Sequence, residues 1–150
     1  PWFGRWGTNY VYGTWSVLEA LAQAGVDMHQ DWIQRAVRWL EAVQRTDGGW
    51  GEENDTYFHP ERARCAPRST PFQTAWALLG LMAAGKANSP PVRSGVDYLL
   101  ASQEAGGTWE DPWFTAPGFP RVFHLKYHGY NKYFPLQALA RYRNLTGRGD

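Results

Sequence analysis

Aromatic side chains recur at helical spacing near the end of the chain. Phe119, Phe123, Tyr127 and Tyr130 follow one another at steps of four, four and three residues, which would place them on one face of a helix. Flat aromatic faces are used where a protein meets sugars, bases or cations. A stripe of this kind is more often part of a hydrophobic core. The spacing leaves two interpretations open, a packed core or an aromatic wall that faces a ligand.

Other groups that could do chemistry are few. His124 and His128 stand at i and i+4, as zinc-binding pairs do, but no acid follows the first histidine and no third ligand is evident. Glu52, Glu53 and Asp55 form a short acidic cluster, which is more typical of an exposed loop than of a cation site. Neither a phosphate-binding loop nor a Ser–His–Asp order is visible. We therefore expect no metal and no cofactor.

The composition excludes several classes of protein. The chain has 150 residues with 9 Trp, 8 Tyr and 7 Phe, more Trp than an ordinary core requires. Its net charge of +1 gives no footprint for nucleic acid or an anionic membrane. The single cysteine, Cys65, excludes an internal disulfide framework and fits a reducing compartment. No apolar run is long enough to span a bilayer, and the first residues lack the layout of a signal peptide.

A turn that combines Gln, Gly and Trp occurs twice. "QRTDGGW" runs from Gln44 to Trp50, and "QEAGGTW" runs from Gln103 to Trp109, so that both the Gln pair and the Trp pair are 59 residues apart. A Gln at the end of one helix can donate its amide to backbone groups of a neighbour, and the Trp can shield that amide from water. We expect a structural link between helices. A ligand contact, above all to a sugar, is the alternative.

The segments before these turns also repeat, and they predict two helices in each unit. Residues 14–25 and 74–85 are similar at an offset of 60, and a third unit begins close to the C-terminus. In the second unit Thr70 and the following Pro form a helix start. The helix then runs to Gly85 and is apolar nearly all round, which indicates burial on every side. The next helix starts at Ser89, and its apolar stripe comprises Val92, Val96, Leu99 and Leu100.

The first unit predicts the same pair of helices. Its second helix is expected to be capped by Asp27, with Gln30 three residues later. One face of that helix is apolar and comprises Ile33, Ala36, Val37, Leu40 and Val43. Alternating inner and outer helices are the pattern of an α/α barrel or solenoid. The predicted fold class is therefore all-α.

Five long stretches of the sequence carry a resemblance to a known family. They are "RAVRWLEAVQRTDGGW", "SGVDYLLASQEAGGTW", "GRWGTNYVYGTWSVL", "STPFQTAWALLGLMAAG" and "GFPRVFHLKYHGYNKYFPLQALARYRNL". They resemble the triterpene cyclases, in particular the C-terminal part of the bacterial squalene–hopene cyclases, and the resemblance covers residues 1–150. It implies part of an α/α barrel, or toroid, in which Gln–Trp motifs tie the outer helices together.

The resemblance also implies a reaction and the residues that surround its substrate. In the family a protonated alkene closes rings one after another through carbocations, without a cofactor. Such a cascade needs a dry cavity and electron-rich walls that stabilise cations without attacking them. The implied substrate contacts are Trp6, Tyr12, Phe119, Phe123, Leu125, Tyr127 and Tyr130. His124 stands where many relatives have an aromatic residue, which leaves the ring outcome open.

The chain departs from the family pattern in one respect. The family protonates its substrate with an Asp in a D-x-D-D motif, and the sequence contains no such motif. The two predicted hairpins are also fewer than a closed barrel needs. We therefore expect the C-terminal part of a longer cyclase, without a catalytic residue of its own and inactive alone.

The expected partners follow from this interpretation. They are squalene or a similar polyene and the remainder of the cyclase chain, but no nucleic acid. The parent enzyme would be peripheral to the cytoplasmic face of the bacterial membrane, and open barrel edges would permit self-association. Two alternatives remain, a related terpenoid cyclase with another polyene substrate and a non-catalytic helical-repeat module that binds ligands or partners.

Overall fold

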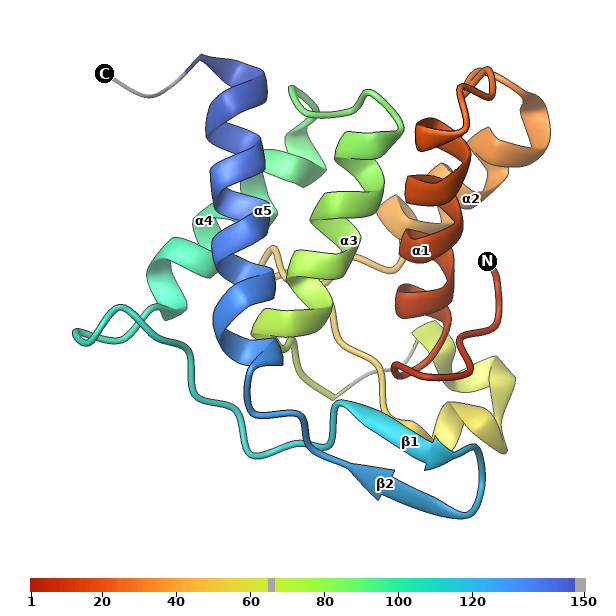
Figure 1. The fold of residues 1–150 in the computed structure, drawn as a ribbon, viewed down its shortest axis with the longest axis vertical. Helices are drawn as coiled ribbons and strands as arrows, with labels where there is room; N and C mark the ends of the chain where they lie inside the picture. The colour runs from red at the N-terminus through yellow and green to blue at the C-terminus, as the bar shows by residue number, and fades with distance from the viewer. Residues whose placement is uncertain (65–66, 148–150) are drawn as a thin grey trace.

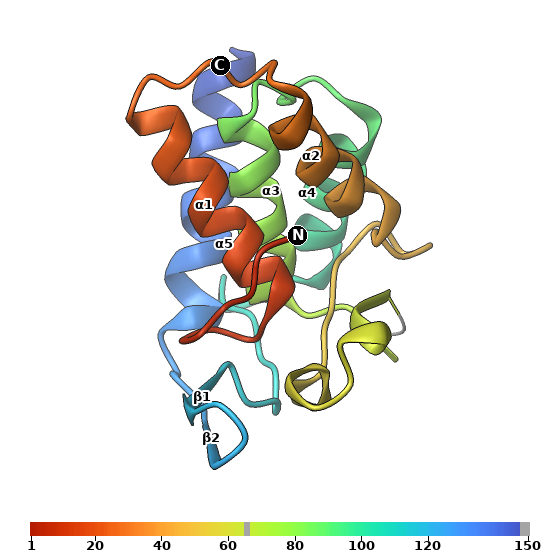
Figure 2. The ribbon, with the colours of Figure 1, turned by 90° about the vertical axis from the view of Figure 1, so that its right-hand side faces the viewer.

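The helices form two layers in the computed structural model, which describes residues 1–64 and 67–147 and leaves Cys65 outside the described residues. The inner layer contains α1 (Tyr10–Gln23), α3 (Pro71–Ala83) and α5 (Tyr130–Thr146), and the outer layer contains α2 (Asp31–Ala42) and α4 (Pro90–Ser102). Figure 1 shows α3 between α1 and α5, and Figure 2 shows α2 and α4 on one side of this row. The alternation of inner and outer helices is as predicted, whereas the closed barrel stays a prediction.

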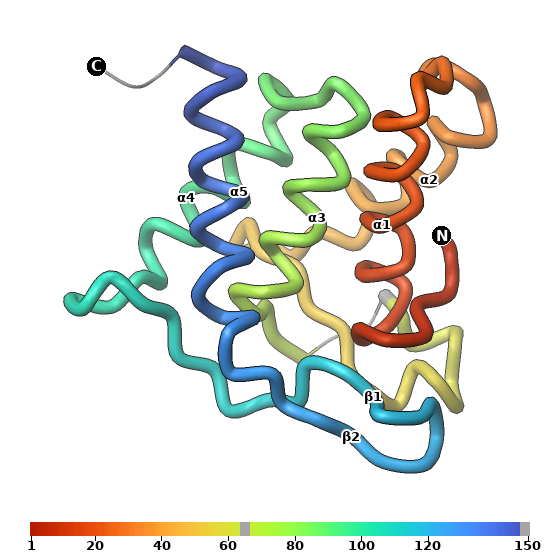
Figure 3. Tube along the Cα trace, viewed as in Figure 1, coloured from red at the N-terminus to blue at the C-terminus, as the bar shows by residue number. Residues whose placement is uncertain are grey.

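Smaller elements lie at the end of the inner layer where its three helices begin. They are the 3-10 helices η1 (Asn54–Tyr57) and η2 (Pro60–Arg64) and the strands β1 (Ala116–Phe119) and β2 (Phe123–Leu125). The two strands pair antiparallel, with Ala116 opposite Leu125 and Phe119 opposite Phe123. The trace in Figure 3 shows this hairpin crossing below the starts of the inner helices.

Local capping explains where α3 and α4 begin and where α1 and α3 end. Thr70 Oγ1 accepts a hydrogen bond from the backbone N–H of Gln73 and Pro71 is the first residue of α3, as predicted. Ser89 caps α4 in the same way. Gly25 and Gly85 follow α1 and α3 with φ of 72° and 76°, a left-handed conformation that glycine adopts without strain.

The predicted cap of α2 at Asp27 is wrong. The helix begins at Asp31, and Gln30 occupies the N-cap position. Asp27 instead accepts a hydrogen bond from the backbone N–H of His29 at 2.9 Å in the preceding turn. Such short side chains often close a turn of their own two residues on, which competes with helix capping.

The helices of the two layers differ in how many of their faces are buried. Twelve consecutive residues of α3, Pro71 to Met82, are buried, as expected for a helix that is apolar all round. In α2 and α4 burial is confined to one stripe. Leu100 was expected on the stripe of α4, but its side chain is 56% exposed beside that stripe. The outer helices are therefore amphipathic, as predicted.

The predicted helix through Phe119, Phe123, Tyr127 and Tyr130 is wrong. Residues 116–125 form the β1–β2 hairpin, and a helix begins only at Tyr130. The turn between the strands is closed by a hydrogen bond from Val122 N to Phe119 O at 3.0 Å. The prolines around this turn disfavour a helix because they lack a backbone N–H. The fold is mostly helical but not all-α.

Candidate functional site

The first Gln–Trp turn joins three helices. Gln44 Nε2 donates to the carbonyl of Pro91, in the first turn of α4, at 2.8 Å. The Trp50 side chain is fully buried, and its Nε1 donates to the carbonyl of Leu40 in α2 at 2.8 Å. The backbone N–H of Trp50 donates to Thr74 Oγ1 in α3 at 2.9 Å. These contacts fit the structural link expected from the sequence.

The second Gln–Trp turn repeats the indole contact. Trp109 is 2% exposed, and its Nε1 donates to the carbonyl of Leu99, ten residues earlier, at 2.8 Å. Gln103 lies on the surface, and its Nε2 donates to the carbonyl of Gly107 at 3.0 Å. This turn therefore closes on its own helix.

Glu52, two residues after Trp50, holds the start of α1. Its carboxylate accepts hydrogen bonds from the backbone N–H groups of Asn9 (3.3 Å), Tyr10 (3.0 Å) and Val11 (2.9 Å). These groups have no partner inside the helix, and a negative charge is favourable there. Burial raises the pKa of Glu52, and the backbone hydrogen bonds act in the opposite direction. The expectation that the whole acidic cluster is exposed is therefore wrong for Glu52.

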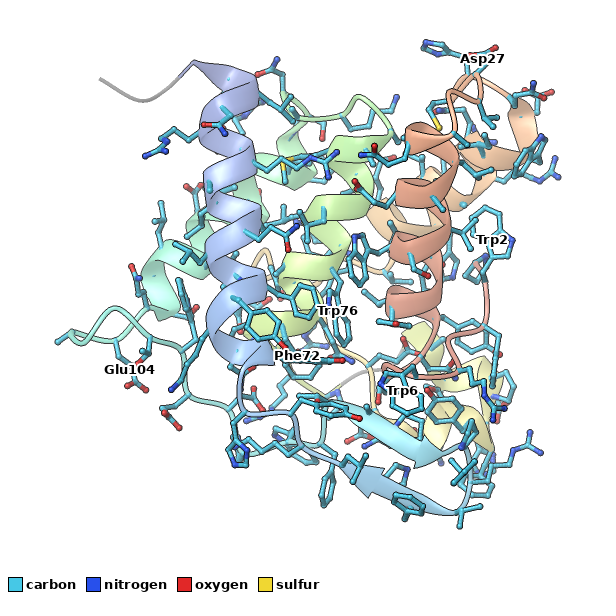
Figure 4. The ribbon with its side chains drawn as sticks, viewed as in Figure 1. Trp2, Trp6, Asp27, Phe72, Trp76 and Glu104 are labelled. Carbon is cyan, nitrogen blue, oxygen red and sulfur yellow. The ribbon has the colours of Figure 1, made fainter. Side chains whose placement is uncertain are left out.

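The three inner helices and the loop before α5 bring eight aromatic rings together. We call this group the aromatic cluster, and it comprises Tyr12, Trp15, Phe72, Trp76, Tyr127, Tyr130, Tyr133 and Phe134. Trp76, which is fully buried, lies at its centre and is labelled with Phe72 on α3 in Figure 4. Its ring meets those of Tyr12 at 5.0 Å and Tyr130 at 5.7 Å edge to face, and it stacks on Trp15 at 5.9 Å. Edge-to-face and stacked pairs are the favourable arrangements for aromatic rings.

Three of the seven predicted substrate contacts belong to the aromatic cluster. Tyr12 lies on α1 and Tyr130 on α5, and Tyr127 stacks on Tyr130 at 4.9 Å. Burial raises the pKa of Tyr12 and raises the pKa of Tyr130 to about 12. Both phenols are therefore neutral at neutral pH. A neutral phenol presents an electron-rich face without the nucleophilic oxygen of a phenolate.

The other four predicted contacts lie at the hairpin end of the molecule. The Phe119 and Phe123 rings face each other across the hairpin at 5.9 Å and are 55% and 45% exposed. Leu125 is half-buried on β2. Trp6 is 46% exposed and lies near the foot of α1, on the side of β1, in Figure 4. We call Phe119 and Phe123 the hairpin face.

The sequence reasoning missed five members of the aromatic cluster as site candidates, namely Trp15, Phe72, Trp76, Tyr133 and Phe134. For Trp15 and Phe134 the signal was present in the spacing. Trp15 lies three residues after Tyr12 and Phe134 four residues after Tyr130, so each shares a helical face with a predicted residue. Which three helices pack together is a tertiary property, and local spacing does not carry it.

The described residues contain no group of three or more His, Cys, Asp or Glu side chains that could hold a metal ion. His124 lies on β2 beside Phe114, with ring centres 5.9 Å apart. Across the described part of the chain, no helix has the length and apolar character needed to cross a membrane.

Two layers of helices tied by Gln–Trp turns, with aromatic rings gathered on the inner helices, define a helical-hairpin repeat protein. Residues 1–144 match the family model of the squalene–hopene cyclase C-terminal domain. The chain therefore belongs to the squalene–hopene cyclase family, as its motifs predicted.

Individual relatives agree with this assignment. The chain is 56% identical to a probable squalene–hopene cyclase of Sinorhizobium fredii and 56% identical to a squalene–hopene cyclase of Bradyrhizobium diazoefficiens, in each case over 96% of its length. It is 44% identical, over 95% of its length, to a dammaradiene synthase of Dryopteris crassirhizoma. The chain spans only 22–23% of the length of these three relatives.

Proposed function

We propose that this chain is the C-terminal portion of an enzyme that cyclises squalene to pentacyclic triterpenes, and that it contributes aromatic walls to the substrate cavity. The observation that carries the proposal is the aromatic cluster, in which neutral rings from three helices converge. Membership of the squalene–hopene cyclase family supports the same conclusion.

The chemistry of a cation cascade explains why neutral aromatic rings are suitable. A ring face stabilises a nearby cation by roughly 0.5–2 kcal/mol or more when the pair is shielded from water. Tyr12 and Tyr130 keep their protons at neutral pH, so their oxygens are weaker nucleophiles toward the cation than a phenolate would be. No cofactor is required for this chemistry, and the protein's share is shape, dryness and electrostatics.

The hairpin face supports a cavity that other parts of a longer chain would complete. Phe119 and Phe123 expose about half of their surface, and exposed aromatic surface is commonly buried by a ligand or another segment. Trp6 and Leu125 are proposed to line the same cavity. The Gln44–Trp50 and Gln103–Trp109 turns are proposed to be structural links between helices.

The initiating acid is proposed to come from outside this chain. The sequence contains no D-x-D-D motif, so we infer that residues 1–150 are inactive alone. The full enzyme is proposed to be peripheral to the cytoplasmic face of the bacterial membrane, where a lipid-soluble polyene is available. Self-association through the open edges of the helical layers is a further proposal for the isolated chain.

A second candidate is a related cyclase that forms a different product. The similarity to a dammaradiene synthase favours keeping this candidate, because that name indicates another triterpene product. Both candidates share the cascade and differ in where it ends.

The test is to change single wall residues in a full-length cyclase that carries this segment. Phe123→Ala and Tyr127→Ala should each slow one cation step about tenfold and release products with fewer rings. Product profiles by gas chromatography are compared with a thermal melt of each variant. Trp32→Ala, on the outer helix α2, is the matched aromatic control and should keep the parental product ratio.

Two results would count against the proposal. If both wall variants melt at much lower temperature but give the parental product ratio, these rings belong to the core. Turnover of squalene by residues 1–150 alone, above a heat-inactivated sample, would contradict the inferred inactivity.

A further inference from the structure

The turn of the β1–β2 hairpin contains an unusual backbone conformation. Arg121 has φ of 68°, and within residues 1–64 and 67–147 it is the only residue other than glycine with positive φ. Pro120 precedes it, and Val122 N donates to Phe119 O at 3.0 Å to close the turn. A turn with proline second and a positive φ third normally has glycine or asparagine at the third position. An arginine there is strained and calls for a compensating contact.

The Arg121 side chain supplies that contact. Its Nε donates a hydrogen bond to the backbone carbonyl of Tyr57, at the end of η1, at 2.7 Å. Its guanidinium also lies over the ring of Phe58, 5.8 Å from the ring centre. These two contacts join the tip of the hairpin to a segment 64 residues earlier in the chain.

Tyr57 extends this connection to the N-terminal segment. Its side chain is 1% exposed, and its hydroxyl lies 2.8 Å from the carbonyl oxygen of Gly4 and 2.9 Å from that of Gly7. Trp6 stands between these two glycines. The base of the hairpin is attached separately, because Thr8 N donates to Thr115 O at 3.2 Å. The hairpin is thus held to the N-terminal segment at its base and, through Arg121 and Tyr57, at its tip.

We propose that Arg121 is a positioning residue that fixes the hairpin face relative to Trp6. It does so by holding the hairpin tip against η1, and η1 in turn holds the loop that carries Trp6. The consequence for catalysis rests on the proposed function, in which these rings line the cavity. Because stabilisation of a cation by a ring weakens with distance, a hairpin that moves at its tip stabilises the passing cation less well.

Three substitutions in a full-length cyclase that carries this segment separate the contact from the backbone strain. Arg121→Gly removes the side chain and the strain together, so its melting temperature should stay within about 2 °C of the parent. Arg121→Ala removes the side chain and keeps the strain, so it should melt lower. Arg121→Lys keeps a cation and an N–H donor and should restore the parental behaviour in part.

The first readout is amide hydrogen exchange, which does not depend on activity. In Arg121→Gly and Arg121→Ala, peptides that cover residues 54–58 and 116–125 should exchange about tenfold faster than in the parent. Arg143→Ala lies near the end of α5 that is remote from the hairpin. It is the control and should leave the exchange rates of both peptides unchanged. Parental exchange in Arg121→Gly would overturn the proposal.

The second readout is the product profile with squalene. The share of products with fewer rings should rise about fivefold in Arg121→Gly, and Arg121→Lys should show a smaller rise. A variant that melts lower or exchanges faster but keeps the parental product ratio would overturn the positioning role. If the parent enzyme itself forms no cyclised product, the proposed function fails, and the exchange measurement still decides whether Arg121 holds the hairpin.

Discussion

The two Gln–Trp turns share their residues but differ in what lies opposite the glutamine. Gln44 Nε2 donates to two carbonyls, that of Gly48 in its own turn and that of Pro91 in the next outer helix, both at 2.8 Å. Gln103 Nε2 donates to Gly107, the equivalent of Gly48, at 3.0 Å. In the described part of the chain no outer helix follows α4. The Gln–Trp motif therefore supplies the donor of a hydrogen bond between helices, and the outer helix of the next repeat supplies the acceptor.

The glycines of the two turns show the same difference. Both Gly48 and Gly107 have positive φ, of 87° and 78°. A Cβ at Gly48 would lie 2.5 Å from the carbonyl oxygen of Ser94 in α4, whereas a Cβ at Gly107 would meet only Gln103 Nε2 at 3.9 Å. The first turn is closely packed against a neighbouring helix, and the second has open space on that side.

The acidic residue two positions after each Trp has a different partner in the two turns. Glu52 caps α1, whose N-cap residue Asn9 makes no side-chain capping bond. Asp111, at the equivalent position, pairs with Arg68 at 2.9 Å. The helix α3 has its own cap in Thr70, so it does not need the acid. Equivalent positions of a repeat thus serve whichever helix start lacks a local partner.

The largest expected effect separates Trp50 from Trp109. Trp50→Ala should lower the free energy of unfolding by roughly 3–5 kcal/mol, because a fully buried ring leaves a cavity. Its ring packs closely against α4, where a Cβ on Gly95 would lie 2.7 Å from Trp50 Cζ3. The loss of unfolding free energy in Trp109→Ala should be about 1 kcal/mol smaller than in Trp50→Ala, since the turn that carries Trp109 lies at the edge of the described helices. Urea denaturation of residues 1–150 alone with each substitution measures both free energies, and a full-length cyclase with the same substitutions is used to measure melting and activity.

Activity per folded molecule should be largely retained in both Trp variants. Trp113→Ala, which truncates a 43% exposed Trp, is the matched control and should change the melting temperature little. Unchanged melting of Trp50→Ala together with a collapse of substrate affinity would show that this Trp is a ligand contact.

The second comparison concerns the acids. Glu52→Ala should cost about 1–3 kcal/mol because it leaves buried backbone N–H groups of α1 without an acceptor. Asp111→Ala should cost about 1 kcal/mol or less, because the Arg68 side chain of its ion pair is 40% exposed to solvent. Chemical denaturation of both variants provides the measurement. Equal losses would mean that the start of α1 finds another acceptor, such as water.

The sequence was informative where structure is decided locally. Thr70 and Ser89 start helices because their side chains bond to a backbone N–H three residues on, and Gly85 ends one because it adopts positive φ. A pattern of residue types contains these features directly. The burial of α3 was predictable for the same reason, since its residues are apolar on every face.

The hairpin was missed because its spacing imitates a helix. Phe119 and Phe123 are four residues apart, which is one helical turn, but the same separation places them opposite each other across a tight turn. The site residues followed from the family resemblance rather than from spacing. The aromatic cluster around Trp76 depends on the packing of three helices, which no local pattern of the sequence determines.

The smallest expected effect tests the comparison most directly. In residues 1–150 alone, Gln44→Ala removes two hydrogen bonds, one of them to another helix, and should cost about 1–2 kcal/mol. Gln103→Ala removes one exposed bond within its own turn and should stay within about 0.5 kcal/mol of the parent. If the rest of a full-length cyclase closes the barrel, as the family resemblance implies, an outer helix lies against Gln103 and accepts its amide hydrogen bond, and the two substitutions should then cost about the same. Urea denaturation of the short chain and thermal melting of the long one supply the four values, with Gln137→Ala on the exposed face of α5 as the control. If the difference between Gln44 and Gln103 persists in the full-length protein, the second turn is a terminal one, and the Gln103 amide has no acceptor in another helix.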